Sequence, residues 1–450
     1  MSFLTIILLI FIPATIVNAN IGDNGHQQYI WKNYPYQPPG TNITFPDDEG
    51  SHNEEYKIEW WYANFHLTGL TTGTEYGSFV AFYLIQSNIF ENLEIRLFSI
   101  SDLAEEETYT NSKVGTLVAS TDHLDLEFIY FNECPEYITH KVPINHEEYL
   151  MMTSIETNES LTSSQSAMGD RSESSPVQCI NVENIEMPNQ LIQTDSWHTK
   201  TNGDDLLPFQ YNLSVGGRSH QDDHPMQLIV DMDCIKRPLI VGGDGLIELG
   251  LGDGFTYYYC LTKLLVNGTI TVHEVTEEVT GYAWIDHQWG DFANPNPPPP
   301  GLVVTYEWFS IKLNDDIEIM TGDTWDRITG EKINQSYAGG LNLLNCDGVL
   351  ELLEDYTITP QGFWLDDYGH LFASRWHITE STKPIDLIIT PVYPDQMMYF
   401  HEDLPIIQQI LAEVMPGSCF WEGVCTVSGN ISGSPVEGKA YVELTHFYEG

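Results

Sequence analysis

Residues 281–292, GYAWIDHQWGDF, set a carboxyl group and an imidazole among aromatic rings. If this segment is a strand, alternate side chains share a face, so Asp286 lies beside Trp284 and Tyr282 and opposite to His287. Aromatic walls remove water from a carboxyl group and raise its pKa, so Asp286 could donate a proton at ordinary pH. The ring faces could stabilise a developing cation. The alternative is an aspartate that caps a turn, with the tryptophans in the core.

Residues 59–69, EWWYANFHLTG, form a second concentration of such side chains. As a strand, this segment has one purely apolar face suited to packing and one face that mixes rings with an amide and an imidazole. The alternative is a half-exposed strand with a solvated histidine. Together with residues 281–292, it supplies the predicted substrate-binding side chains, which are Trp60, Tyr62, Asn64, His66, Tyr282 and Trp289.

The sequence predicts no metal and no cofactor. Asp286, His287 and Asp291 could offer oxygen and nitrogen ligands, as could residues 222–224 (DDH), but neither group has a known ligand spacing such as HExxH. The nucleophile elbow GxSxG of serine hydrolases does not occur. The glycine-rich residues 242–254 match neither the Walker A nor the Rossmann spacing.

The pattern of short apolar runs predicts an all-β chain. Runs rich in Val, Ile, Tyr, Phe and Thr are broken by Gly, Asn, Asp and Pro, and aromatic residues make up 12% of the chain, which suits barrels or sandwiches. Residues 257–273 predict a hairpin with a tight turn at Asn267 and Gly268. Only residues 406–414, IIQQILAEV, predict a helix.

Two stretches interrupt the strand pattern. Residues 153–178 are rich in Ser, Thr and Glu without an apolar period, which predicts a disordered insertion. Residues 294–301, NPNPPPPG, cannot join a sheet and favour an extended conformation. We place the domain boundary there, between an N-terminal domain at 40–294 and a C-terminal domain at 302–450.

The N-terminus predicts a secreted, extracellular protein. Residues 1–19 are apolar from Phe3 to Val17 and resemble a signal peptide cut after Ala19; a retained anchor is the alternative, although the apolar run is short for a span. No later segment is long and apolar enough to cross a bilayer. Six glycosylation sequons follow, at Asn42, Asn158, Asn212, Asn267, Asn334 and Asn430.

The cysteine content and the net charge bear on the compartment and the binding partners of the protein. In an oxidising compartment some of the 7 cysteines should pair, and Cys419 with Cys425 is the predicted local bridge. The formal net charge is −48, with 17 Lys and Arg against 65 Asp and Glu. Such a chain repels nucleic acid and anionic membrane surfaces, and a solvated acidic surface is the simplest interpretation.

Several blocks of the chain resemble one family. Residues 45–69, 257–272, 281–292, 308–320 and 420–447 are similar, in order, to the signatures of the CrtC/AttH lipocalin-like family. That family includes carotenoid 1,2-hydratases (hydroxyneurosporene synthase), kievitone hydratase and fungal cyclases of the Diels–Alderase type. The resemblance implies two packed lipocalin-like antiparallel β-barrels with a pocket for an apolar ligand.

The resemblance also implies a chemistry. In the hydratases an aromatic-x-Asp pair supplies the acid that protonates an alkene, and this pair corresponds to Trp284 and Asp286. The hydratases favour tyrosine at the position of Trp284 and carry a His-x-Trp element upstream of the acid, which this sequence lacks before Asp286. The predicted function is therefore a secreted hydratase or lyase for an apolar isoprenoid or polyketide-like substrate, with water oriented by His287, His66 or Asn64. Alternatives are a Diels–Alderase-type cyclase, a non-catalytic carrier of an apolar ligand, and a hydrolase.

Overall fold

The computed structural model describes residues 31–53, 55–86, 93–131, 192–248, 254–291, 304–326, 329–333, 340–367, 369–398 and 420–448. The predicted signal peptide, disordered insertion, proline-rich boundary and helix all lie outside these residues. Within them the only helix is the 3₁₀-helix η1 (Asp47–Glu49), and no helix there has the length and apolar character needed to cross a membrane.

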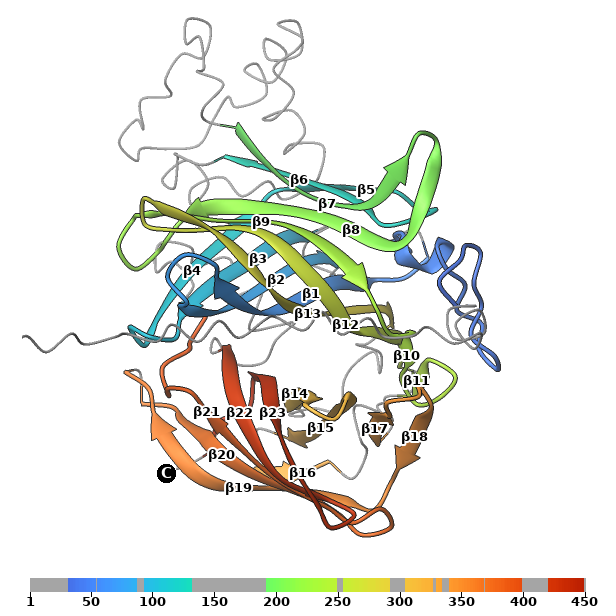
Figure 1. The fold of residues 1–450 in the computed structure, drawn as a ribbon, viewed down its shortest axis with the longest axis vertical. Helices are drawn as coiled ribbons and strands as arrows, with labels where there is room; N and C mark the ends of the chain where they lie inside the picture. The colour runs from blue at the N-terminus through green and yellow to red at the C-terminus, as the bar shows by residue number, and fades with distance from the viewer. Residues whose placement is uncertain are drawn as a thin grey trace, which may run out of the picture.

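The first sheet has 13 strands within the described residues and curls into the upper half of the molecule (Figure 1). Its order is β4-β3-β2-β1-β13-β12-β9-β8-β7-β6-β5, with β10 and β11 paired to β12. The strands are β1 (Ile58–Gly69), β2 (Glu75–Ile85), β3 (Leu93–Asp102), β4 (Glu107–Val114), β5 (Thr116–Ala119), β6 (Asp125–Phe131), β7 (Ile192–Asn202), β8 (Asp205–Arg218), β9 (Pro225–Cys234), β10 (Leu239–Ile240), β11 (Leu246–Glu248), β12 (Phe255–Val272) and β13 (Val275–Asp291).

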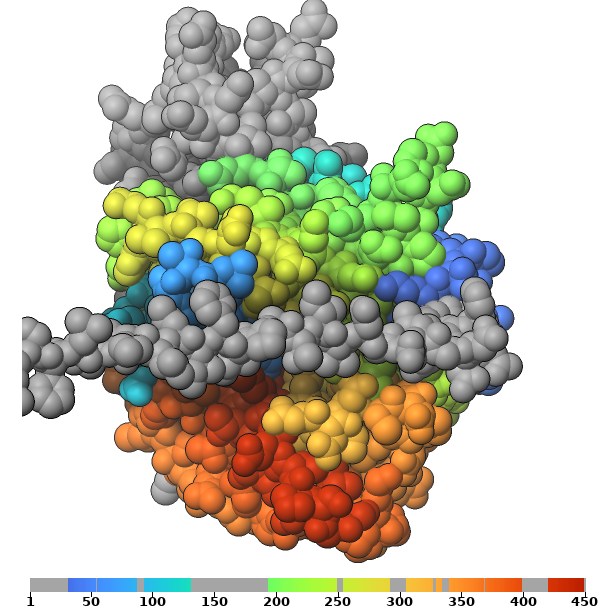
Figure 2. All heavy atoms as spheres, viewed as in Figure 1, coloured from blue at the N-terminus to red at the C-terminus, as the bar shows by residue number. Residues whose placement is uncertain are grey.

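The second sheet has 10 strands within the described residues, in the order β18-β17-β15-β14-β23-β22-β21-β20-β19, with β16 paired to β15. It curls below the first, and Figure 2 shows the two as adjoining bodies, coloured blue to yellow and orange to red. Its strands are β14 (Val304–Leu313), β15 (Ile317–Asp326), β16 (Glu331–Lys332), β17 (Leu341–Leu344), β18 (Leu350–Leu353), β19 (Tyr356–Leu365), β20 (Leu371–Glu380), β21 (Ile385–Pro391), β22 (Trp421–Ile431) and β23 (Ser434–Leu444). The all-β prediction with two nearly closed antiparallel sheets is confirmed.

Each sheet curls until its two outermost strands are consecutive in the chain: β4 and β5 in the first, β18 and β19 in the second. Gly115 joins β4 to β5. A Cβ atom at Gly115 would lie 2.5 Å from the carbonyl oxygen of Ile129, so only glycine fits where the chain turns this corner.

A buried arginine ties the curled N-terminal sheet together. Arg96 on β3 donates from Nε to Asp195 Oδ2 at 2.8 Å, and from its two terminal nitrogens to the carbonyl oxygens of Asn111 at 3.0 Å and Gly216 at 2.9 Å. These partners lie on β4, β7 and β8. The guanidinium therefore links strands from both ends of the sheet order.

Replacing Arg96 with methionine should cost about 3–5 kcal/mol of unfolding free energy, because it leaves the Asp195 carboxyl buried without its partner. Denaturant unfolding at neutral pH measures this loss. The control is Lys200→Met, which removes an ion pair with Asp231 that is partly exposed and should cost less than about 1 kcal/mol. Equal losses in the two variants would contradict the structural role of Arg96.

Alternating side chains divide the apolar residues among three clusters. On β1, Trp61 and Phe65 point into the first sheet's own core, while Tyr62 points to the opposite side. The second sheet has its own core around Phe309. A third cluster combines Tyr62 with Trp308 and other residues of both sheets, so it fills the interface between the two sheets.

The predicted turn at Asn267 and Gly268 is wrong. Strands β12 and β13 pair along their whole length, Asn267 lies opposite Thr280, and the turn comes at His273. The reason is close strand packing, because a Cβ at Gly268 would collide with the backbone of β9.

The predicted bridge between Cys419 and Cys425 is also wrong, because Cys425 is a free and buried thiol. Its side chain packs in the core of the second sheet. Cys419 lies outside the described residues.

Candidate functional site

Strands β1 and β13 bring the two sequence motifs side by side. They pair antiparallel with Tyr62 opposite Asp286 and Asn64 opposite Trp284. All four side chains are buried, and Tyr62 and Trp284 belong to the apolar cluster between the sheets. The predicted alternation of faces therefore places Asp286 at the interface between the two sheets.

The Asp286 carboxyl group is enclosed and hydrogen-bonded. Trp284 Nε1 donates to Oδ1 at 2.8 Å, and the Tyr258 hydroxyl donates to Oδ2 at 2.9 Å. Burial raises the pKa of Asp286 to about 7, although hydrogen bonds from Cys260, Trp284 and Tyr258 oppose the shift. Near neutral pH, the carboxyl group is therefore divided between its acid and anionic forms.

The second sheet contributes two further carboxyl groups that we did not predict. Glu422 on β22 and Glu443 on β23 are directly opposite each other, and the Tyr62 hydroxyl donates to Glu422 Oε2 at 3.1 Å. Burial raises the pKa of Glu422, and raises that of Glu443 to about 8. The charge of Asp286 adds to both shifts. A sequence signal existed, since each glutamate interrupts an apolar stretch, in FWEGV and in YVELT.

One buried lysine lies near Asp286. Burial lowers the pKa of Lys312 on β14 to about 7, although Glu318 and Asp286 favour its charged form. Lys312 favours the charged form of Asp286, whereas the charge of Asp286 raises the pKa of both glutamates, so the three buried carboxyl groups cannot all ionise near neutral pH. The interface therefore retains at least one acidic proton.

Several buried polar atoms at this interface have no hydrogen-bond partner among the residues described. Asn64 donates through Nδ2 to Ser310 Oγ at 3.1 Å, yet its Oδ1 has no partner. The same holds for His66 Nδ1, Trp308 Nε1, Lys312 Nζ, Glu422 Oε1 and Tyr441 OH. Buried polar atoms normally find partners, so this set marks where the polar groups of a ligand or water could bind.

The structure separates Tyr282, His287 and Trp289 from Asp286, whereas Trp60 packs against the apolar cluster between the sheets. Tyr282 is 43% exposed and lies under the ammonium of Lys263, and Trp60 is half-buried against Tyr83. His287 and Trp289 point to the opposite face of β13, into the first sheet. A strand has a period of two, so His287 cannot orient water at Asp286. Asn64 and His66 do lie on the Asp286 face.

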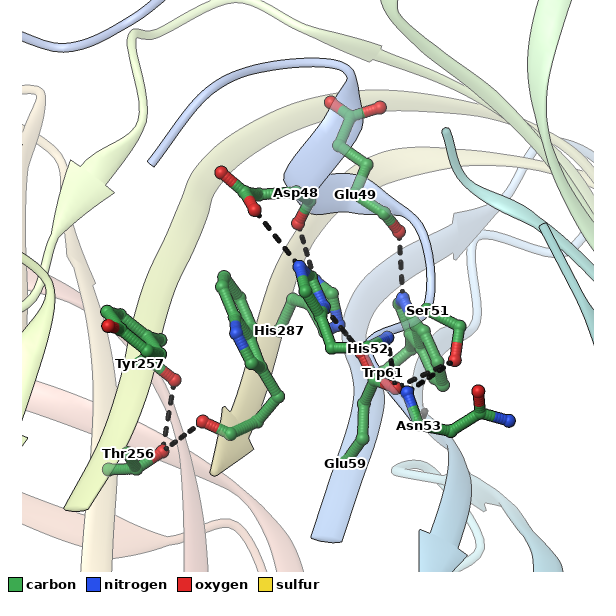
Figure 3. Close-up of polar contacts among 11 residues, drawn as sticks. Asp48, Glu49, Ser51, His52, Asn53, Glu59, Trp61, Thr256, Tyr257 and His287 are labelled. Atoms are coloured by element: carbon green, nitrogen blue, oxygen red, sulfur yellow. Dashed lines mark hydrogen bonds and ion pairs between the residues drawn. The ribbon is translucent and has the colours of Figure 1, made fainter. Parts of the chain in front are cut away.

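His287 instead joins a second polar group, which we call the histidine–carboxylate cluster and define as Asp48, His52, Glu59 and His287 (Figure 3). His287 contacts Glu59 Oε1 through Nε2 at 3.0 Å and the Asp48 carbonyl oxygen through Nδ1 at 2.9 Å. His52 contacts Glu59 Oε1 through Nδ1 at 2.9 Å and Asp48 Oδ1 through Nε2 at 3.0 Å. The cluster holds the segment after η1 against β1 and β13.

Aromatic rings and burial set the charges of this cluster. His52 stacks on Trp289 with ring centroids 4.1 Å apart, and His287 stacks on Trp61 at 4.8 Å. Burial alone would lower the pKa of His52, but hydrogen bonds to Asp48 and Glu59 outweigh it and raise the pKa to about 9. Burial lowers the pKa of His287 against the opposing effect of Glu59.

The cluster also contains the side chains best placed to hold a metal. His52, Glu59 and His287 each offer a ligand atom, and these atoms lie within 4.8 Å of one another. No other such group of three occurs among the described residues. The groups weighed from the sequence, around Asp291 and at residues 222–224, are not of this kind.

Two curled antiparallel sheets, each around its own apolar core, with a buried polar site between them define a lipocalin-like two-barrel protein. The comparisons with known proteins agree. The AttH-like family model matches residues 146–447, and the chain belongs to this family. The resemblance drawn from the sequence motifs is thereby confirmed.

Two solved structures share the fold. An AttH protein from Nitrosomonas europaea is 19% identical, with a TM-score of 0.58 over 91% of this chain and 99% of its own. Kievitone hydratase from Nectria haematococca is 14% identical, with a TM-score of 0.54 over 92% of this chain and 98% of its own. No curated protein matches the sequence. At these identities the two structures establish the fold alone.

Proposed function

We propose that this protein adds water to a C=C bond of an apolar isoprenoid or polyketide-like molecule held between the two sheets, or removes water in the reverse direction. The observation that carries the proposal is the buried Asp286 carboxyl beside Trp284, with a pKa of about 7. A carboxyl group in that state can donate a proton at neutral pH. The fold shared with a hydratase supports the same class of reaction.

The reaction would proceed in two proton transfers. Asp286 gives its proton to one alkene carbon, and the cation left on the other carbon is sheltered by the rings of Trp284 and Trp308, whose centroids are 6.3 Å apart. Water attacks the cation, and Glu422 orients this water through Oε1, which is buried without a partner among the described residues. The proton released by the water returns to the Asp286 carboxylate and restores the starting state. Because burial raises the pKa of Glu422, this group keeps its own proton and takes the water-orienting part that we had expected of His287, His66 or Asn64.

A carrier of an apolar ligand is the second candidate. Both oxygens of Asp286 already accept a hydrogen bond, from Trp284 and from Tyr258, so the carboxylate form needs no substrate to be satisfied. Such a protein would use the unpartnered polar atoms between the sheets for binding alone.

Secretion remains part of the proposal. Asn42, Asn212, Asn267 and Asn430 are all exposed, as attachment of a glycan requires, and the sequons at Asn158 and Asn334 lie outside the described residues. Deglycosylation of protein from the medium of a eukaryotic host should lower its apparent mass. N-terminal sequencing should begin at Asn20 if the signal peptide is cut after Ala19.

The deciding experiment starts from the secreted full-length protein. Apolar molecules that co-purify are extracted, identified by mass spectrometry, and returned to the purified protein in ¹⁸O-labelled water. We expect a product heavier by one labelled water molecule, or the loss of water from a tertiary alcohol. Tight binding without label incorporation would favour the carrier, and an isomerised product without label would favour a cyclase.

A further inference from the structure

The histidine–carboxylate cluster joins three ligand atoms of the kinds that zinc prefers. The atoms come from His52 in the segment after η1, from Glu59 on β1 and from His287 on β13, and they lie within 4.8 Å of one another (Figure 3). Two imidazole nitrogens and one carboxylate oxygen are a common donor set for zinc. The site lies on the face of β13 opposite to Asp286.

In each ring, the nitrogen that faces Asp48, which we call the outer nitrogen, already donates a hydrogen bond. The nitrogen that faces Glu59 is the inner nitrogen. His287 Nδ1 faces the Asp48 carbonyl oxygen at 2.9 Å, and His52 Nε2 faces Asp48 Oδ1 at 3.0 Å. A carbonyl or carboxylate oxygen can only accept, so each of these nitrogens carries the hydrogen. In neutral imidazoles the inner nitrogens then present lone pairs to Glu59. Histidines that bind metals are held in the same way, with the outer N–H on a carboxylate or a backbone carbonyl.

With both rings neutral, the inner atoms lack positive charge. His52 Nδ1, His287 Nε2 and Glu59 Oε1 are three acceptors, with both nitrogens 2.9–3.0 Å from the same oxygen. Either one further proton on each ring or one divalent cation would satisfy these three acceptor atoms. Each alternative adds two positive charges, which balance the two negative charges of Asp48 and Glu59. The protons would place two charged rings 5.8 Å apart, whereas one ion satisfies all three atoms together.

We propose that His52, Glu59 and His287 bind a divalent transition-metal ion of the zinc type. Ligands of tetrahedral zinc, with bonds of about 2.0–2.1 Å, lie roughly 3.3 Å apart. The two nitrogen–oxygen contacts would therefore open by a few tenths of an ångström, and the two nitrogens, which lie within 4.8 Å of each other, would adjust to the same spacing. The His52 side chain is 16% exposed, which provides a path for the ion and a place for a water ligand. The bound ion would fasten the segment after η1 to β1 and β13 and so stabilise the first sheet.

To test the proposal, the full-length protein is incubated with ZnCl₂ and dialysed against metal-free buffer. The zinc content per chain is then measured by mass spectrometry. We expect about one zinc ion per chain in the wild type, and at least about a tenfold lower content in Glu59→Gln and His52→Ala, since each removes a ligand. His273→Ala is the matched control, because it removes an exposed imidazole paired with Asp222 and should leave the zinc content unchanged. Zinc should also raise the melting temperature of the wild type and the control alone.

Histidine nitrogen NMR of the wild type keeps the test decisive if a variant fails to fold. With zinc bound, one nitrogen in each of His52 and His287 should carry no hydrogen, and its resonance should shift when zinc is added. Four protonated nitrogens in the zinc-treated protein would overturn the proposal in favour of two imidazolium rings. A wild-type zinc content no higher than that of Glu59→Gln would overturn it as well. Neither result depends on hydration activity.

Discussion

The variant Asp286→Asn should lose hydration while keeping its fold. Asparagine has the same shape and can still accept from Trp284 Nε1, but it has no acidic proton to give to a C=C bond. General acid catalysis is worth about 10²–10⁴ in rate, so the rate of ¹⁸O incorporation should fall by about that factor. The control is Asp386→Asn, which removes an exposed carboxylate on β21 and should leave the rate unchanged.

The pH dependence of the wild type provides a second measurement of the same group. The reaction uses the acid form of Asp286, whose pKa is raised to about 7 by burial. The hydration rate should therefore be steady on the acid side of this value and fall about tenfold per pH unit above it. The small residual rate of Asp286→Asn should lack this fall.

Other outcomes separate the competing functions. If Asp286→Asn converts the ligand at the wild-type rate and no labelled water is incorporated, the protein is a cyclase that only folds its substrate into a reactive shape. A wild type and a variant that bind equally and convert nothing would indicate a carrier. Wild-type hydration rates in Asp286→Asn would exclude Asp286 as the acid.

Glu443→Gln should make the protein less sensitive to alkaline pH. Glu422 and Glu443 face each other on β22 and β23, and burial raises the pKa of both, that of Glu443 to about 8. Because the folded state binds these protons more tightly than the unfolded state, their contribution to stability is complete below the usual glutamate pKa of 4.5. It is lost as the pH rises through about 8.

The wild type should lose about 2–4 kcal/mol of unfolding free energy between pH 5 and about pH 8.5 through this pair, and the variant at most about half of that. Denaturant unfolding at the two pH values measures the difference. The matched control is Glu437→Gln on the same strand, because Glu437 is exposed and its replacement should leave the pH trend unchanged. An identical trend in wild type and Glu443→Gln would show that the pair carries no shared proton.

Sequence alone was sufficient for features that depend on neighbours along the chain. The alternation of side chains placed Trp284 and Asp286 on one face and His287 on the other, and it separated Tyr62 from Trp61 in the same way. This works because the two-residue period of a strand is local. The local signal failed at Asn267 and Gly268, where a dipeptide typical of turns lies in mid-strand because β9 approaches closely.

Only the tertiary structure decided which side chains meet Asp286. Glu422 and Glu443 are more than a hundred residues away in sequence, and no periodicity on β22 or β23 specifies the sheet that they face. The same reason hid the contact of His287 with His52 and Glu59, because it requires β1, β13 and the segment after η1 to come together. Strand period sets the direction of a side chain, whereas the packing of one curled sheet on another sets its partners.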